Sequence, residues 1–368
     1  MAAVALDAPS PLDWPPYRTG RGVNLKMTSA TINDVAREAG VSIKTVSRVL
    51  NAEPHVRDEL RQKVLKAVQE LHYRPNVSAR SLAGGRSYVV GYLLAGMNAY
   101  QVLAQLGALR ACRERSYHLL VESVDLQSDI GAELEQMAQA VGVDGVLLLP
   151  SLCDNAQVLD GLDRLGVPYV RVSPANDQAR SPCVEVDDEA AARVMTEHLL
   201  GLGHRRIGFV RGREGHSSSA RRLAGYREAM RRGGADLDPA LIQDGDFTYE
   251  SGRAAASALL ALEAPPTAIF AANDLMACGV LARAQELGLQ LPASLSVAGV
   301  DDIPEAAMVW PALTTMRQPI ADMAAAATAM IIARAGRSKD APAEPGMFRC
   351  ELVVRGSTAP PGSGPRRG

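Results

Sequence analysis

The chain has 368 residues, of which 47% are apolar and 22% are charged, and these proportions exclude a disordered acidic chain. The longest apolar run without a charge, Met323 to Ala333, is too short to cross a bilayer. The formal net charge is −2, but ten Lys and Arg oppose six Asp and Glu from Met27 to Arg86, whereas 26 oppose 33 from Ser87 to Gly368. A small basic module therefore precedes a large acidic one.

Residues 1–29 predict a disordered leader, because they contain four prolines and show no helical period. They also lack a basic segment followed by an apolar one, so a signal peptide is not expected. The start of translation remains open between Met1 and Met27. The five cysteines show no Cys-x-x-Cys spacing, which is typical of a reducing compartment, and we expect a cytoplasmic protein.

Three short helices are predicted within residues 30–73. Thr31 to Asp34 has the sequence of a capping box, and Gly40 ends the first helix. Ser42 is a suitable N-cap for the second helix, and a third runs from about Arg57 to His72. The alternative to a DNA-binding helix-turn-helix is a plain three-helix bundle, but the local positive charge favours DNA. The second helix has a polar face that consists of Lys44, Thr45, Ser47 and Arg48.

A linker is predicted over residues 74–86. Pro75 stops the third helix, and the Gly84-Gly85 pair gives a flexible exit. The segment from Asn76 to Ala83 can form a short helix, but so short a helix needs a partner to become ordered.

From Ser87 onward, short apolar runs alternate with amphipathic stretches, which is typical of a doubly wound α/β sheet. A segment of this length usually forms two lobes that bind a ligand at the carboxyl ends of the strands. Residues 359–368 are rich in Pro, Gly and Arg and predict a disordered tail. The predicted strands are Val89–Leu94, Tyr117–Val121, Asp144–Leu149, Tyr169–Val172, Arg206–Val210, Ala268–Ala271 and Ser296–Val300.

Several short sequence motifs along the chain occur together in one protein family. They include Thr31–Asn51, Arg74–Asn76, Ala79–Ala83, Gly203–Val210, Arg222–Tyr226, Ala271–Met276, Gly299–Ile303 and Glu351–Thr358. Over roughly residues 31–358 the chain resembles the LacI/GalR family of transcription regulators. The resemblance implies a two-lobed, doubly wound core like that of periplasmic binding proteins, preceded by a small all-α helix-turn-helix domain. The implied boundaries are 30–73 for that domain, 74–86 for the linker, about 87–184 and 319–337 for the first lobe, and about 185–318 and 346–358 for the second.

The resemblance also implies the DNA contacts. Ile43, Lys44, Ser47 and Arg48 stand where family members contact base edges, and Thr31 and Thr45 stand where they contact the DNA backbone. Arg48 or Lys44 can reach guanine O6 and N7, whereas Ile43 offers an apolar contact. In the linker, Asn76, Arg80 and Leu82 are expected to contact DNA, with Leu82 as a minor-groove wedge. Arg57 departs from the family, since relatives often have Ser there, and exchanges a cap for a phosphate contact.

A hydroxyl-rich effector is expected between the lobes. Asn273 and Asp274 leave an alternative open, because they can instead cap the following helix. Ser173 stands at a position where members of the family often have Asp. Ala95–Ala99 replaces the Pro-Asp and Asn-Pro segment that is more typical of the family. Both departures argue against a standard hexose as the effector. We expect Arg222→Ala to fold, to bind operator and to need more effector for release. By resemblance the cleft is lined by Asn98, Tyr100, Ser173, Ser218, Arg222, Phe247, Asn273, Asp301 and Gln318.

The sequence thus predicts a repressor that binds a palindromic operator as a homodimer and is released by a small sugar-like effector. One alternative keeps the DNA-binding module but has a purine-like corepressor that tightens binding. Another, from a different class, is a plain sugar-binding protein or an enzyme. We expect no catalytic residues, no cofactor and no metal, since the six histidines form no His-x-x-x-His pair.

Overall fold

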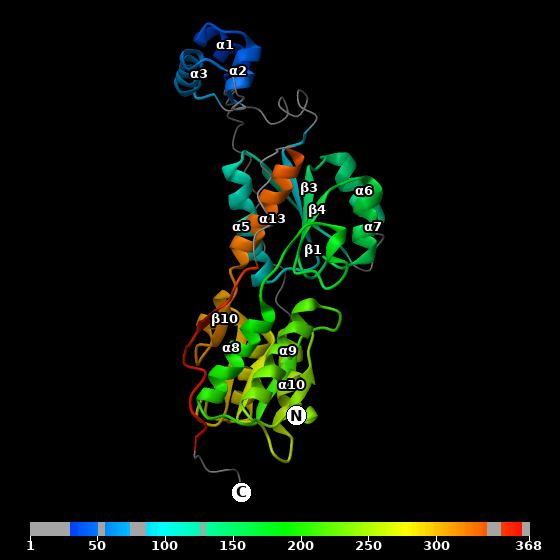
Figure 1. Ribbon diagram of the computed structural model, residues 1–368, viewed down its shortest axis with the longest axis vertical. Helices are drawn as coiled ribbons and strands as arrows, with labels where there is room; N and C mark the ends of the chain where they lie inside the picture. Colours follow the sequence, from blue (N-terminus) through cyan, green and yellow to red (C-terminus); the bar gives the residue numbers. More distant parts are fainter. Residues whose placement is uncertain are drawn as a thin grey trace, which may run out of the picture. The chain divides into compact units, whose positions relative to one another are not determined.

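A computed structural model describes residues 30–50, 56–73, 86–125, 128, 130–336 and 347–362 (Figure 1). The chain falls into two compact units that divide between Ala79 and Arg80. The predicted leader and tail end, residues 1–29 and 363–368, lie outside the described residues. So do residues 74–85 of the linker, with the three predicted DNA contacts Asn76, Arg80 and Leu82.

The first unit consists of the helices α1 (Ile32–Ala39), α2 (Ile43–Leu50) and α3 (Asp58–Glu70). The capping box is present, because the backbone N–H of Thr31 donates to Asp34 Oδ2 at 2.9 Å and that of Asp34 donates to Thr31 Oγ1 at 3.4 Å. Gly40 ends α1 with a left-handed φ of 63°, which a residue without a side chain adopts at little cost. The three helices share one small core made of Val35, Ala36, Val46, Val49, Val64 and Ala67.

The first lobe of the second unit contains a five-stranded parallel sheet in the order β2-β1-β3-β4-β5. Figure 1 shows α5 and α13 on one face of this sheet and α6 and α7 on the other. The strands are β1 (Val89–Leu94), β2 (His118–Ser123), β3 (Gly145–Leu148), β4 (Tyr169–Val172) and β5 (Cys183–Val184). The helices are α5 (Ala99–Glu114), α6 (Ile130–Ala140), α7 (Ala156–Leu165) and α13 (Ile320–Ala335), with a 3-10 turn at Gln178–Arg180.

The second lobe contains a six-stranded sheet in the order β11-β10-β9-β8-β6-β7, in which only β11 runs antiparallel to its neighbour. Its strands are β6 (Ile207–Arg211), β7 (Ile242–Asp244), β8 (Ala268–Ala271), β9 (Ser296–Asp301), β10 (Thr314–Arg317) and β11 (Glu351–Val353). Its helices are α8 (Asp188–Gly201), α9 (Ser217–Arg232), α10 (Tyr249–Leu260), α11 (Asp274–Glu286) and α12 (Pro304–Met308), with a 3-10 turn at Pro239–Leu241.

The two lobes are not consecutive in the sequence. The chain enters the second lobe after β5, returns to the first with α13 and ends in the second with β11. In the first lobe α13 lies beside α5 (Figure 1). A Cβ on Gly107 would lie 1.9 Å from the carbonyl oxygen of Ala321, so only glycine permits this close approach of the two helices.

All seven predicted strands are present, with ends that differ by at most two residues. Four short strands were not predicted from the sequence: β5, β7, β10 and β11. The polar composition of β10 hides it, because Thr314 and Thr315 are fully buried through hydrogen bonds to Arg355 N–H and Asp274 rather than through apolar packing.

The predicted disordered tail is wrong for its first residues. The backbone N–H of Ala359 donates to Ser296 Oγ at 3.0 Å, and the Ala359 carbonyl oxygen lies 2.9 Å from His204 Nε2. These hydrogen bonds attach the chain to the second lobe as far as Gly362, whose N–H donates to Ala293 O. Across the ranges that the structure describes, no helix combines the length and apolarity that a bilayer crossing requires.

Candidate functional site

The polar face of α2 points away from the core of its unit. Val46 and Val49 are buried, whereas the Ile43 side chain is 49% exposed and Lys44 is exposed. The hydroxyls of Ser42 and Thr45 lie 2.9 Å apart, and the backbone N–H of Thr45 donates to Ser42 Oγ, so Ser42 is the N-cap that the sequence predicts. Ser47 and Arg48 are half-buried on the same helix.

Thr31 is exposed at the start of α1, but its hydroxyl is engaged within its own unit. It donates to Asp34 Oδ2 at 2.7 Å. Accepting hydrogen bonds from the backbone and side chain of Thr31 holds the pKa of the Asp34 carboxyl below its usual range. Thr31 therefore fixes the start of α1, and its contact with the DNA backbone stays a prediction.

In the core, Arg222 occupies the centre of a buried polar group. Its Nε donates to Asp188 Oδ1 at 2.7 Å, its Nη1 donates to the carbonyl oxygen of Ala272, and its Nη2 lies 3.8 Å from Asp301 Oδ1. The Arg222 side chain is 4% exposed and that of Asp188 is 1% exposed. One guanidinium thus lies between two buried carboxylates that come from different elements of the second lobe.

The close packing of α8 against α9 creates this contact. A Cβ on Gly225 would lie 2.1 Å from the carbonyl oxygen of Glu189 and 3.0 Å from Cβ of Ala192. Only glycine allows so short a distance, and Gly225 lies on the same face of α9 as Arg222, one turn further along. The packing therefore presses the Arg222 face of α9 against the first turn of α8, where Asp188 lies.

Asp301 lies at the end of β9, with a left-handed φ of 121° that Asp tolerates better than most residues. Gln318 Nε2 donates to Asp301 Oδ1 at 2.6 Å. Burial raises the pKa of Asp301 to about 7 even though Arg222 acts in the opposite direction. Asp274, fully buried nearby, accepts hydrogen bonds from Thr315 Oγ1 and Ile303 N–H, and burial together with Asp301 raises its pKa.

The first lobe contributes Tyr100 and Ser173. Burial raises the pKa of the Tyr100 hydroxyl, and the charges of Asp301, Arg222 and Asp188 also act on it. Ser173, which follows β4 and is 4% exposed, accepts a hydrogen bond on its carbonyl oxygen from Ser217 Oγ at 2.6 Å. Ser218, the next residue of α9, is also buried. The five residues Tyr100, Asp188, Arg222, Asp301 and Gln318, called the junction cluster below, thus lie where the two lobes meet, with Ser173 beside the start of α9.

The other three predicted cleft residues have local roles. Asn98 is exposed and caps α5, because its Oδ1 accepts from the N–H of Gln101. Asn273 caps α11 through its Oδ1 and donates from Nδ2 to the Phe247 carbonyl oxygen at 3.1 Å, so the capping alternative is the one present. The Phe247 ring lies over Gly212, with its centre 5.3 Å from that of His216. Their contacts with an effector stay predictions.

Sequence reasoning missed Asp188. The sequence favours a first-turn position for Asp187, Asp188 and Glu189 alike, but the structure separates them. Asp187 is the N-cap of α8 and accepts from the N–H of Ala190, whereas Asp188 is buried against Arg222. A signal was available, because Asp188 stands at helical spacing from the buried Ala192, Met195 and Leu199 and so lies on the apolar face of α8.

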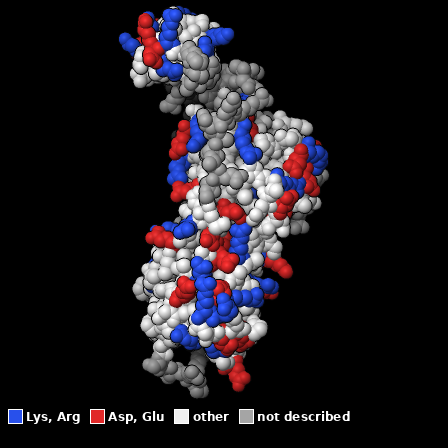
Figure 2. Space-filling model, viewed as in Figure 1, with Lys and Arg blue, Asp and Glu red and all other residues white. Residues whose placement is uncertain are grey.

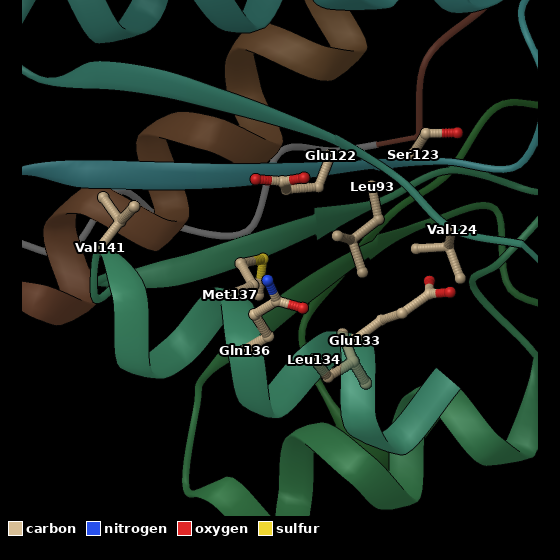
Figure 3. Close-up of a pocket in the computed structure, with 9 residues that line it drawn as sticks. All are labelled: Leu93, Glu122, Ser123, Val124, Glu133, Leu134, Gln136, Met137 and Val141. Atoms are coloured by element: carbon tan, nitrogen blue, oxygen red, sulfur yellow. The ribbon is translucent and has the colours of Figure 1, made fainter. Parts of the chain in front are cut away.

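A cavity of about 280 Å³ lies elsewhere, within the first lobe (Figure 3). Figure 3 shows Glu133 and Met137 of α6 facing the ends of β1 and β2, where Leu93 and Glu122 lie. None of the predicted effector residues lines it. Among the described residues there is also no group of three or more His, Cys, Asp or Glu placed to hold a metal ion.

Comparison with known proteins identifies the family. The family profile described as "Bacterial regulatory proteins, lacI family" matches residues 31–76, and that described as "Periplasmic binding protein-like domain" matches residues 196–358. Catabolite control protein A of Priestia megaterium is 34% identical over 307 residues, which cover 82% of this chain and 92% of that protein. The chain belongs to the LacI family of bacterial regulatory proteins.

Solved structures agree with this assignment. The transcriptional regulator CelR in its cellobiose complex has a TM-score of 0.68 and 31% identity, covering 89% of this chain and all of that one. The lac repressor dimer bound to operator and the anti-inducer ONPF has a TM-score of 0.67 and 27% identity, covering 90% and 99%. As a LacI-family protein, the chain is a DNA-binding transcriptional regulator, and the predicted family and fold class are confirmed.

Proposed function

We propose that this LacI-family protein is a repressor that binds a palindromic operator as a homodimer and is released by a small sugar-like effector. The junction cluster carries the proposal. It gathers Tyr100 of the first lobe and Arg222 of the second around one buried polar site, so a ligand bound there touches both lobes. A ligand shifts the arrangement of two lobes only by its differential affinity for the arrangements, and coupling of this kind typically amounts to about 1 to 3 kcal/mol.

For DNA, we assign base contacts to the exposed face of α2. Arg48 and Lys44 carry the donors that pair with guanine, and Ile43 supplies the apolar contact. We further assign the DNA backbone contacts to Thr45 and Thr31, and the rest of the interface to the linker residues Asn76, Arg80 and Leu82. A single helix-turn-helix contacts only one half-site. Two copies related by a twofold axis contact both half-sites and so bind a specific operator more tightly.

Exposed apolar side chains support the homodimer. Val102 and Leu106 lie one turn apart on α5 and are exposed. Met308 at the end of α12 and Trp310 just after it are exposed in the second lobe. Apolar side chains of this size gathered on one element mark a protein interface more often than a solvated face. On the face that Figure 2 draws, Lys and Arg side chains lie interspersed with Asp and Glu side chains over both lobes, so that face carries charges of both signs.

For the effector, CelR is a relative that was solved with cellobiose, and the junction cluster offers Asp, Gln and Tyr groups that pair with hydroxyls. We assign no catalytic step to the chain, since its relatives are named as regulators, and we place its action in the bacterial cytoplasm, where operator DNA lies.

The test starts from duplexes selected by the full-length protein from a random pool. We expect a sequence with twofold symmetry, bound with an affinity that falls steeply as salt rises. Titration of that duplex is then repeated with sugars and with purine bases. A sugar that weakens binding about 5- to 150-fold supports the proposal. A purine base that tightens binding supports the corepressor alternative, and failure to select any sequence contradicts both.

A further inference from the structure

Two buried acceptors at the lobe junction lack a partner. Among the residues that the structure describes, neither Asp188 Oδ2 nor Ser173 Oγ has a hydrogen-bonding atom within reach. Both side chains are more than nine-tenths buried, since Asp188 is 1% exposed and Ser173 is 4% exposed. Buried polar atoms in folded proteins are nearly always paired, and a buried carboxylate oxygen without a partner is costly. The pair therefore points to a group that arrives from outside the chain.

The chemistry of the orphaned atoms restricts that group. An ionised carboxylate oxygen only accepts hydrogen bonds, so whatever pairs with Asp188 Oδ2 must donate one. The other oxygen of Asp188 already accepts from Arg222 Nε at 2.7 Å. The Ser173 hydroxyl both donates and accepts, and so accommodates a ligand hydroxyl in either direction.

The local charge restricts it further. Arg222 is the only cation paired with Asp188 and Asp301 within the described part of the chain. Its Nε donates to Asp188, its Nη1 donates to the Ala272 carbonyl oxygen, and its Nη2 lies 3.8 Å from Asp301 Oδ1. An anionic ligand that drew Arg222 toward itself would leave a buried acid without its cation. A phosphate ester that is ionised at neutral pH would add negative charge beside two acids and offer no donor to Asp188.

We infer that Asp188 is a specificity-determining residue of the effector site, and that it selects an uncharged, hydroxyl-bearing ligand and rejects phosphorylated or acidic ones. The inference deepens the proposed function and rests on it. Asp188 accepts a ligand hydroxyl on Oδ2, Ser173 pairs with a second hydroxyl from the first lobe, and Arg222 holds Asp188 in position.

The first experiment tests whether the protein binds uncharged or anionic ligands. The full-length protein is screened by thermal shift against monosaccharides, disaccharides and alditols, together with their phosphate esters and acids, because a ligand that binds only the folded state raises the apparent Tm. We expect the ligands that raise the Tm to be uncharged, and a phosphate ester to bind at least about tenfold more weakly than its parent sugar. A phosphate ester or acid as the tightest ligand overturns the inference, and so does the lack of any uncharged ligand.

The second experiment isolates Asp188. Asp188→Asn keeps the shape and an acceptor for Arg222 Nε, but it removes the charge and turns the orphaned oxygen into a donor. We expect affinity for the tightest uncharged sugar to fall about tenfold and inorganic phosphate to bind more tightly than it does to the wild type. Asp187→Asn is the matched control, because Asp187 is the neighbouring N-cap and Asn caps equally well. If both variants behave alike, Asp188 has no role in selection.

A variant on the other lobe guards against a folding defect in Asp188→Asn. Ser173 has a left-handed φ of 48°, so Ser173→Gly removes the hydroxyl without backbone strain. We expect it to weaken the uncharged sugar several-fold, and an unchanged affinity contradicts the inference. Operator binding is measured on every preparation. If the wild-type protein binds no operator DNA, the proposed function is refuted. If it binds operator and is released by an acidic effector, only the charge selection is refuted.

Discussion

The two regions of this protein that we assign to recognition place polar residues in opposite environments. On α2 the polar side chains lie on an exposed or half-buried face of one helix, with Val46 and Val49 buried behind them. In the core, Arg222 and Asp188 are buried between two helices. In the first region the side chains expected to recognise DNA differ from those that hold α2 in its unit, because Val46 and Val49 pack in the core. In the second the same side chains serve both, since each buried charge depends on the other.

This difference changes what we expect of Arg222. The sequence indicates that Arg222→Ala folds and loses only its response to effector. From its burial we expect a cost to folding as well, because truncation leaves Asp188 and Asp301 as buried acids without their cation. Substitutions in the two regions should therefore have effects of different kinds, and four predictions test this contrast, beginning with the largest expected effect.

Arg222→Ala should lower the free energy of unfolding of the core by about 3 to 5 kcal/mol, which is the usual range when one partner of a buried ion pair is removed. Urea denaturation followed by circular dichroism measures it. The control is the neighbouring Arg221→Ala, which removes a partly exposed ion pair with Glu185 and should cost less than about 1 kcal/mol. Equal effects for the two variants would mean that the Arg222 pair is not buried as described.

The stability of the core should depend on pH through Asp301. Because burial raises its folded pKa to about 7, the folded protein holds a proton between about pH 4 and pH 7 that the unfolded chain has released. Stability should therefore fall as the pH rises through this window, by roughly 2 to 4 kcal/mol, and level off above it. Asp301→Asn cannot titrate and should show a flatter profile in denaturation at pH 5, 6, 7 and 8, with the remaining slope from Asp274. A profile as steep as that of the wild type would refute the assignment.

Arg48→Ala should act on recognition instead of folding. We expect a loss of about 1 to 3 kcal/mol on the selected operator and relaxed preference at one base pair of each half-site. Fluorescence anisotropy with single-base operator variants measures both, and the thermal unfolding of the variant should stay close to that of the wild type. An equal loss on random DNA would reassign Arg48 to a phosphate contact.

Arg57→Ser should show the smallest effect. Arg57 precedes α3 with an extended backbone, and its side chain makes no capping hydrogen bond. A Ser hydroxyl there can accept from the first turn, so the first unit should gain about 0.5 to 1 kcal/mol of stability. If Arg57 contacts a phosphate, the same change should reduce the salt dependence of operator binding by about one counterion. A variant that is less stable would show that Arg57 contributes in another way.

The sequence predicted local features well and long-range contacts poorly. The capping box at Thr31, the turn at Gly40 and the N-cap at Ser42 each depend on residues within four positions, and all three are present as predicted. The seven predicted strands were found because each is mostly apolar. By comparison β10 was missed, because Thr315 is buried through a hydrogen bond to Asp274, which lies 41 positions away.

The sequence by itself determined the family, the fold class and the start and end of most elements, because caps, turns and hydrophobic periods are local properties of the chain. Only the tertiary structure decided that Asp188 faces Arg222 and that Ala359 is attached to Ser296. The contacts of Asp188 and Ala359 join residues that are 34 and 63 positions apart. The first depends on how closely α8 and α9 pack at Gly225, and contacts between residues so far apart leave no periodic pattern in a single sequence.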